Sequence, residues 1–250
     1  MGARQHAVFG LHAAEAVLKR RPRDIVRACL MRGEQRGRLG GIEQALRAAG
    51  VAIERVGRDE LDRLAQGGSH QGVVLQVPPP SALGLRDLER IVSECGQDLR
   101  LLVLDQIEDP RNLGACLRTA DAAGMDAVIV PKARSAKLSG AALKVATGAA
   151  ETVPLIVVPN LARVLRWLRD AGVRLAGAAG EGRVSLFEAE LQPPIALVLG
   201  AEESGLRRLS REACDELVRI PMRGHVESLN VSVAAGVLIF EMLRQAEEGR

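Results

Sequence analysis

The feature that most constrains this chain is a series of short apolar runs that recur through residues 101–250. They lie at 101–104, 127–130, 155–158, 174–178 and 195–199. Most are separated by segments with the 3.6-residue apolar period of a helix. Short continuous apolar runs are typical of strands that are buried on both faces. The alternation therefore predicts an α/β fold with a parallel sheet covered by helices on both sides.

The front of the chain predicts a smaller α/β unit. Its expected helices lie at 11–20, 42–49 and 58–65, and its expected strands at 25–31, 51–56 and 72–77. Three consecutive prolines, beginning at Pro78, then interrupt regular structure and open a linker that contains a helix at 85–94. We therefore expect two domains, 1–78 and 98–250, joined by the linker 79–97.

Positive charge is concentrated in the first unit. The whole chain has a net charge of +3, but residues 1–80 hold 13 Lys and Arg against 8 Asp and Glu. This excess predicts a polyanionic partner such as RNA or DNA, although a solvated arginine-rich surface gives the same pattern. With no Tyr, one Trp and three Phe, recognition would depend on phosphate contacts and shape rather than on base stacking.

The sequence disfavours several other classes of protein. No apolar segment reaches the roughly 18 to 20 residues of a membrane span, and the first residues lack the apolar run of a signal peptide. The four cysteines are scattered without a CxxC pair, which favours reduced thiols in a cytoplasmic protein over a zinc site. Because the glycine fingerprints of nucleotide-binding folds are absent, a dinucleotide-dependent dehydrogenase is the weakest alternative.

Polar loops follow three of the predicted strands, at 105–118, 200–206 and 220–230. Ligands of parallel α/β sheets bind beyond the carboxyl ends of the strands, so these loops are predicted to share one site. The first loop places Asn112 at a helix start, with Arg118 farther along, and the second begins at Gly200. Taken singly, each also fits a structural alternative: a capped helix with an exposed arginine, or a surface turn.

The third loop lies between a strand that Pro221 ends and a strongly apolar helix that begins near Val231. Ser228 and Asn230 stand just before that helix, where unpaired N–H groups favour polar caps or ligands. Capping of a core helix and ligand binding explain this pattern equally well. The helix is so apolar that we expect most of its faces to be covered. The histidines His70 and His225 are expected to be structural or surface residues.

Together the loops resemble the motifs of the SpoU/TrmH branch of the SPOUT RNA 2′-O-methyltransferases, across essentially the whole chain. The motifs are DPRNLGACLRTADAAG at 109–124, VLGAEESGL at 198–206, and IPMRG at 220–224 with SLNVSVAA at 228–235. The runs AVIVPKARS at 127–135 and GAAE at 148–151 also fit. The resemblance is greatest to the RlmB type, the 23S ribosomal RNA guanosine 2′-O-methyltransferases. The first domain, including SHQG at 69–72, is similar to the L30e-like RNA-binding domain of that type.

The resemblance implies features that periodicity could not reveal. It implies a deep trefoil knot in the C-terminal parallel-sheet domain, beside the small L30e-like N-terminal domain. The knotted backbone is expected to hold S-adenosylmethionine through Gly200, Ile220 and Leu229. A homodimer with its active site at the interface and a reaction without a metal are also implied.

The resemblance further implies which residues act on the substrate. Arg118 is expected to reach the ribose 2′-hydroxyl from the other protomer. Because a guanidinium keeps its proton at all relevant pH values, we interpret Arg118 as a cation that lowers the pKa of the hydroxyl rather than as a base. Asn112 and Glu203 are expected to hold that arginine, and Ser228 and Asn230 to order the ribose and the loop.

The implied reaction is methylation of a guanosine ribose in the peptidyl-transferase P-loop of 23S rRNA, during ribosome biogenesis. The alternatives are methylation of tRNA or of another rRNA nucleotide, and a non-catalytic RNA-binding assembly protein. An additional N-terminal domain favours rRNA, because tRNA-specific relatives usually lack one. The five polar residues expected in the site disfavour a protein without catalysis.

Overall fold

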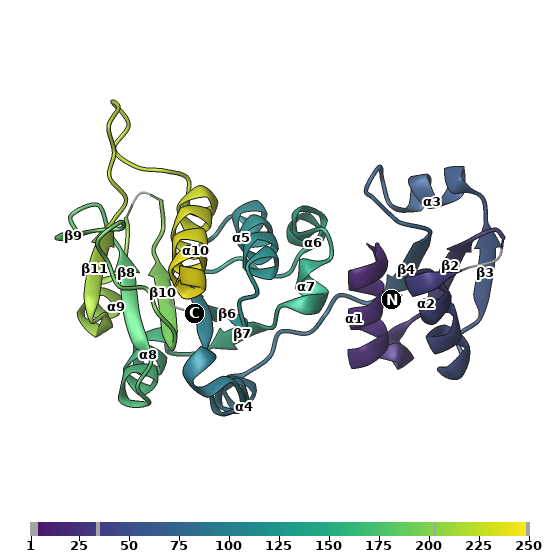
Figure 1. Ribbon diagram of the computed structural model, residues 1–250, viewed down its shortest axis with the longest axis horizontal. Helices are drawn as coiled ribbons and strands as arrows, with labels where there is room; N and C mark the ends of the chain where they lie inside the picture. Colours follow the sequence, from purple (N-terminus) through teal and green to yellow (C-terminus); the bar gives the residue numbers. More distant parts are fainter. Residues whose placement is uncertain (1–4, 34–35, 203, 249–250) are drawn as a thin grey trace. The chain divides into compact units, whose positions relative to one another are not determined.

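The chain forms two compact units in the computed structural model, which describes residues 5–33, 36–202 and 204–248. The first unit contains the residues up to Ser81 together with Thr147–Thr152. The second contains Ala82–Ala146 and the chain from Val153 onward. Figure 1 labels most of the helices and strands of both units.

The first unit is built on a mixed sheet that has four strands among the described residues. The strands are β1 (His6–Phe9), β2 (Arg27–Met31), β3 (Ile53–Val56) and β4 (Val73–Val77). Their order is β1-β4-β2-β3, and only β2 and β3 run parallel. Helices α1 (Leu11–Arg20) and α2 (Gly37–Ala48) pack over one apolar cluster, and α3 (Arg58–Leu64) covers another. A 3-10 turn, η1 (Pro22–Asp24), joins α1 to β2.

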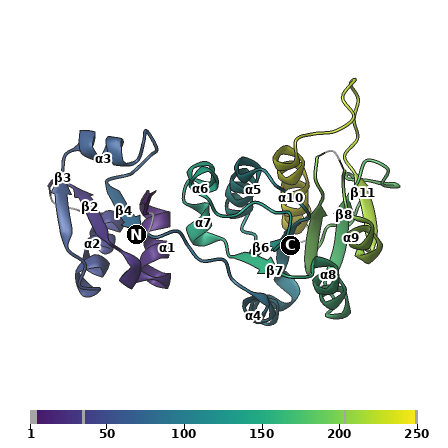
Figure 2. The same cartoon turned by 180° about the vertical axis from the view of Figure 1, so that it is seen from behind.

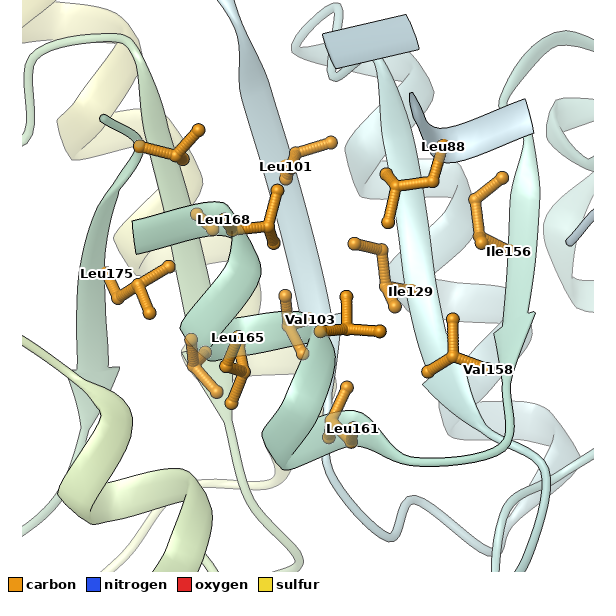
Figure 3. Close-up of a cluster of buried hydrophobic side chains, with 14 of the residues drawn as sticks. Leu88, Leu101, Val103, Ile129, Ile156, Val158, Leu161, Leu165, Leu168 and Leu175 are labelled. Carbon is orange, nitrogen blue, oxygen red and sulfur yellow. The ribbon is translucent and has the colours of Figure 1, made fainter. Parts of the chain in front are cut away.

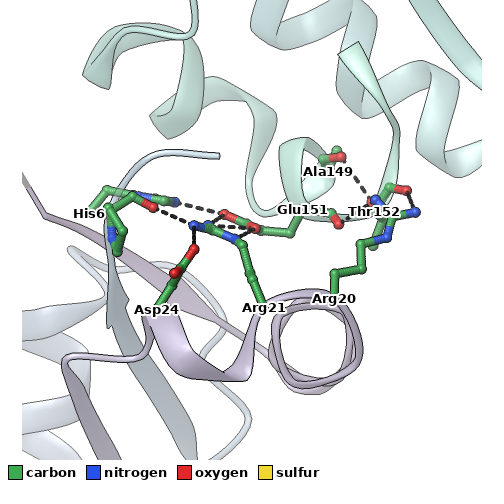
Figure 4. Close-up of polar contacts among 8 residues, drawn as sticks. His6, Arg20, Arg21, Asp24, Ala149, Glu151 and Thr152 are labelled. Atoms are coloured by element: carbon green, nitrogen blue, oxygen red, sulfur yellow. Dashed lines mark hydrogen bonds and ion pairs between the residues drawn. The ribbon is translucent and has the colours of Figure 1, made fainter. Parts of the chain in front are cut away.

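A buried carboxylate holds part of this unit together. Glu151 lies in α7 (Ala149–Thr152), and its side chain is only 3% exposed. Its two oxygens accept hydrogen bonds from the Arg21 guanidinium at 2.7–3.1 Å, and His6 Nε2 lies 3.1 Å from Oε1 (Figure 4). Arg20 donates to the carbonyl oxygens of Glu151 and Thr152. These bonds compensate a carboxylate whose burial would otherwise be unfavourable.

The second unit is built on a parallel sheet that has seven strands in the described part of the chain. They are β5 (Arg100–Leu104), β6 (Ala127–Pro131), β7 (Leu155–Val158), β8 (Arg174–Ala178), β9 (Val184–Ser185), β10 (Ile195–Leu199) and β11 (Glu216–Arg219). The spatial order is β7-β6-β5-β10-β8-β11-β9. Strand β10, late in sequence, therefore lies between β5 and β8 at the centre of the sheet.

Helices cover both faces of this sheet (Figures 1 and 2). On one face, α4 (Leu85–Cys95), α8 (Leu161–Asp170) and α9 (Arg208–Ala213) pack on the strands through the apolar cluster of Figure 3. A 3-10 turn, η2 (Gly96–Asp98), follows α4. On the other face lie α5 (Pro110–Ala122), α6 (Gly140–Ala146) and α10 (Val231–Glu248). Because side chains alternate along a strand, Leu101 and Val103 face the first layer and their neighbours face the second.

The predicted α/β class, with a parallel sheet and a smaller N-terminal α/β part, is confirmed. Two strands, β1 and β9, were not predicted. Helix α2 begins at Gly37, whereas the sequence predicted a start at residue 42, because the glycines of its first turns are typical of residues that interrupt helices. Most faces of the last helix are covered, as expected, but one side is exposed within this chain. Val233 and Phe240 of α10 are 51% and 50% exposed. None of the helices in the described residues is long and apolar enough to cross a membrane.

Candidate active site

A pocket of about 1080 Å³ opens at the carboxyl ends of β8, β10 and β11. The strand ends supply Ala178, Leu199 and Val218, and the segments 179–181 and 219–229 form most of the remaining lining. The carboxyl edge of a parallel sheet is where ligands bind, and the volume lies just above the usual range of about 300–1000 Å³. The segment between β11 and α10 projects beyond the strand ends (Figures 1 and 2).

Four residues that the sequence predicted for the site line this pocket: Gly200, Ile220, Ser228 and Leu229. Gly200 must be a glycine, because an added Cβ would lie 2.1 Å from the carbonyl carbon and oxygen of Gly205. Ala201 and Gly205 exchange main-chain hydrogen bonds of 3.2 and 2.9 Å across this tight loop. The loop therefore turns its main chain, rather than a side chain, toward the pocket at residue 200.

A carboxylate and two amides meet beside the pocket. Glu202 Oε1 accepts hydrogen bonds from Asn112 Nδ2 at 2.9 Å and from Asn230 Nδ2. Asn230 Nδ2 also donates to Asn112 Oδ1 at 3.1 Å. The same Glu202 oxygen accepts from the main-chain N–H of Val231, in the first turn of α10, where the helix dipole favours a negative charge. One side chain from each predicted loop thus enters a single network, which we call the Asn–Glu–Asn network.

Glu202 is the residue that sequence reasoning missed. The sequence prediction selected its neighbour Glu203, which lies outside the described residues. Two adjacent carboxylates in one turn look equivalent in sequence, and no local signal distinguishes them. The long-range bonds from Asn112 and Asn230, 90 and 28 residues away, identify Glu202.

Arg118 lies on α5 but apart from this network. Its side chain is exposed and has no hydrogen bond or ion pair with any described residue. Asn112 was expected to hold it, yet within this chain Asn112 binds Glu202 and Asn230. Six residues along a helix amount to about 240° of rotation beyond one full turn, which directs the two side chains to different sides.

A buried carboxylate connects the start of the first polar loop to the end of the second. Asp105, at the end of β5, is fully buried and accepts from Arg207 Nε at 2.7 Å. Its other oxygen accepts from the main-chain N–H of Arg207 at 3.3 Å. Arg207 follows the 200–206 loop directly, so this pair fixes the end of the second loop against the start of the first.

His225 is exposed and lines the pocket, whereas His70 and two of the cysteines are structural. His70 is buried, and its Nδ1 accepts the main-chain N–H of Gly72, a structural role. Burial raises the pKa of both Cys116 and Cys214 to about 12, so these thiols stay protonated at neutral pH. In the described residues no three His, Cys, Asp or Glu side chains are grouped so as to hold a metal ion.

Known proteins match the chain along nearly its whole length. Residues 100–240 match the SpoU rRNA Methylase family, and residues 7–83 match the family described as RNA 2′-O ribose methyltransferase substrate binding. A 23S rRNA (guanosine-2′-O-)-methyltransferase, RlmB of Vibrio cholerae, is 49% identical over 97% of this chain and 98% of its own length.

Solved structures share the fold as well. The SpoU methyltransferase AviRb from Streptomyces viridochromogenes, in complex with the cofactor AdoMet, has a TM-score of 0.71 at 26% identity and covers 96% of this chain and 90% of its own. A TrmH/SpoU tRNA modifying enzyme of A. aeolicus has a TM-score of 0.56 at 27% identity and covers only 66% of this chain and 84% of its own. The resemblance predicted from three loops is thereby confirmed, and the chain belongs to the SpoU rRNA methylase family.

Proposed function

We propose that this protein transfers a methyl group from S-adenosylmethionine to the ribose 2′-oxygen of a guanosine in 23S rRNA. The observation that carries the proposal is the Asn–Glu–Asn network at the edge of a pocket lined by Gly200, Ile220 and Leu229. The 49% identical relative named for this reaction spans both units. The tRNA modifying enzyme covers 66% of the chain, which disfavours tRNA as the substrate.

The volume of the pocket and its charged lining residues suit the cofactor. Gly200 leaves no room for a Cβ, so its main chain can approach a ligand closely. Glu181, Glu227 and Arg223 among the lining residues provide partners for a ligand that carries both ammonium and carboxylate groups. We expect Gly200, Ile220 and Leu229 to hold the cofactor, which when bound supplies a methyl group activated on a sulfonium.

The residues beside the pocket then align and activate the hydroxyl. Ser228 and Asn230 position the ribose so that its 2′-oxygen forms the new O–C bond as the C–S bond breaks, and the hydroxyl proton leaves to water. Arg118 stabilises the negative charge that develops on that oxygen. Glu202 does not touch the ribose in this scheme; it keeps Asn112 and Asn230 in place.

Arg118 performs this role in the site of a second protomer. It is exposed on α5 and lacks a partner in the described residues, so it is available to another chain. The neighbouring helix α10 exposes Val233 and Phe240, which are seven residues apart and therefore share a face. An apolar stripe of this kind beside α5 supports a homodimer whose site lies at the interface.

The last point of the proposal concerns the path of the chain between β8 and α10. An added Cβ at Gly182 would lie 2.7 Å from the carbonyl oxygen of Leu217, and Arg219 donates to the carbonyl oxygens of Gly182 and Arg183. The chain of β11 thus passes tightly against the loop after β8, before α10 packs on β10 and α5. We propose that the chain in this region forms the trefoil knot that the family resemblance implies. Pulling both chain ends apart would leave a contour shorter than that of an unknotted chain.

Arg118→Ala tests the catalytic assignment. We expect turnover to fall by at least about 100-fold, as for the loss of an oxyanion donor, with cofactor affinity within about twofold. Transfer of tritiated methyl groups to 23S rRNA measures turnover, with tRNA and 16S rRNA as comparison substrates. Mapping of 2′-O-methylation would identify the nucleotide, for which we expect the P-loop guanosine. We also propose that the enzyme works in the cytoplasm, where it meets this substrate. Near-normal turnover of the variant would refute the role of Arg118.

A mixing experiment tests whether Arg118 acts across the dimer. Arg118→Ala and Glu202→Ala should each be inactive alone. Mixed dimers contain one site with both residues intact if Arg118 acts in the partner, so activity should return on mixing. If mixing restores nothing while exchange of subunits is demonstrated, Arg118 acts within its own chain.

A further inference from the structure

Four exposed cations follow strand β6 without any acidic neighbour in sequence. Lys132, Arg134 and Lys137 lie in the loop between β6 and α6, and Lys144 lies on α6. The segment 131–146 contains no Asp or Glu. None of the four side chains has a hydrogen bond or ion pair with the described residues. We call these four residues the basic strip.

Several other basic residues of the same unit are neutralised by nearby carboxylates. Arg174 pairs with Glu190 and Glu216, and Arg208 pairs with Glu212 at 2.7 Å. Such pairing cancels the field of an arginine at short range. The four cations of the basic strip are not paired with a carboxylate of the described residues, and unpaired cations attract polyanions.

The strip is fixed close to the Asn–Glu–Asn network. The main-chain N–H of Ala136 donates to the carbonyl of Ile107 at 2.7 Å, which attaches its loop to the loop before α5. Helix α6 packs so closely on α5 that a Cβ at Gly114 would lie 2.4 Å from the carbonyl oxygen of Ala142. Helix α5 carries Asn112 and Arg118. The strip is therefore held on the elements that present these two residues.

The distance from the pocket suits a strand of nucleic acid. Only β5 separates β6 from β10, and at about 4.8 Å between strands the two carboxyl ends are about 10 Å apart. A few nucleotides of a single RNA strand are enough to span a gap of this size. Backbone phosphates near a ribose held at the pocket would thus reach the strip.

We propose that the basic strip binds backbone phosphates of the rRNA within a few nucleotides of the ribose that receives the methyl group. This inference rests on the proposed function. The chain has one Trp, three Phe and no Tyr, so base stacking has few side chains available and phosphate contacts provide the affinity. Contacts of this kind position the substrate and do not select its sequence.

The test compares two triple variants with equal loss of charge. The first is Lys132→Gln/Arg134→Gln/Lys137→Gln. The matched control is Arg163→Gln/Arg166→Gln/Arg169→Gln on α8, whose three arginines are exposed, lack side-chain partners in the described residues and lie in the opposite helical layer. Affinity for a 23S rRNA fragment is measured over a series of KCl concentrations, and cofactor affinity is measured by calorimetry.

We expect the strip variant to bind RNA at least about tenfold more weakly, and its salt-dependence slope to decrease by about 2, at about 0.7 per lost phosphate contact. The α8 variant should remain within about twofold of the unchanged protein, and both should bind the cofactor normally. Equal losses in the two variants, or none in the first, would overturn the inference. Lys144→Gln alone, an exposed helix position compatible with folding, should reduce the slope by about 0.7. An unchanged slope there also counts against the strip.

The proposed function and this inference fail separately. If the unchanged protein methylates 23S rRNA but the strip variant binds it as well as before, only the strip is refuted. If the unchanged protein transfers no methyl group to 23S rRNA, the proposed function is refuted, whatever the binding data show.

Discussion

Two helices of the second unit begin on an asparagine cap, and the two caps differ in what else they contact. Asn160 caps α8 by accepting the main-chain N–H of Arg163 at 3.0 Å, and its amide has no other bond among the described residues. Asn230 caps α10 through the main-chain N–H of Ser232, also at 3.0 Å. Its Nδ2 atom additionally donates to Asn112 and Glu202.

The difference shows how one residue type serves local structure or a site, depending on its neighbours. Both caps follow strands of the same sheet and face its carboxyl edge. Strand β7, before α8, is an edge strand of that sheet, and the Asn160 side chain bonds to no neighbouring loop among the described residues. Asn230 lies where the loops after β5 and β10 converge. The sheet order therefore makes one cap part of the candidate site.

Among the substitutions that test this difference between the two caps, Asn230→Asp is expected to lower turnover most. Aspartate caps a helix as well as asparagine does, but it cannot donate to Glu202 and places a second carboxylate beside it. The loss of one charge-assisted and one neutral bond, about 2.7 kcal/mol together, would reduce turnover about 100-fold. Methyl transfer to 23S rRNA measures this.

Asn160→Asp is the matched control for that change. It retains a cap and touches no described site residue, so turnover should be unchanged. If both substitutions reduced turnover alike, the Asn–Glu–Asn network would have no special part in the reaction.

Gly200→Ala tests the same principle with two glycines of the pocket, Gly200 and Gly224. A Cβ added at Gly200 would collide with the main chain of Gly205, and relieving that overlap should cost about 2 kcal/mol, or roughly 30-fold in cofactor affinity. Gly224→Ala is the control, because Gly224 lines the same pocket with no atom within 4 Å of the added Cβ. Calorimetric titration with S-adenosylmethionine distinguishes them. Equal affinities for the two variants would contradict a close approach at Gly200.

The smallest effect is expected for Asn160→Ala. Loss of this cap should lower the free energy of unfolding by about 1 kcal/mol and Tm by about 2–4 °C, with normal turnover and cofactor affinity. Thermal unfolding and the methyl-transfer assay provide the two readouts. A folded variant with impaired turnover would show that α8 contributes to the site after all.

Much of the site could be predicted because its residues lie in loops with recognisable positions. Gly200, Ile220, Ser228 and Leu229 all line the pocket, and Asn112 and Asn230 meet beside it. Glu202 could not be chosen over Glu203, since its distinction is a set of contacts with distant residues. The roles of Arg118 and Glu203 remain predictions, since Arg118 depends on a second protomer and Glu203 lies outside the described residues.

The fold likewise divides into features that local sequence predicts and contacts between distant segments that it does not. Apolar runs and helical periods predicted most strands and helices of the second unit, because those signals arise within a few residues. Strand β1 was missed because only four residues form it, and its antiparallel pairing with β4 joins segments about 70 residues apart. The insertion of β10 between β5 and β8 was equally invisible, since no local pattern encodes which strands become neighbours.

The sequence by itself determined the α/β class, the three polar loops and the family to which the chain belongs. Each of these depends on residue types at short spacing, which a single chain displays directly. The tertiary structure alone decided that Glu202 joins Asn112 to Asn230, that Asn160 remains a simple cap, and that the basic strip lies beside α5. These are contacts across the sheet, and their existence depends on strand order and helix packing rather than on local propensity.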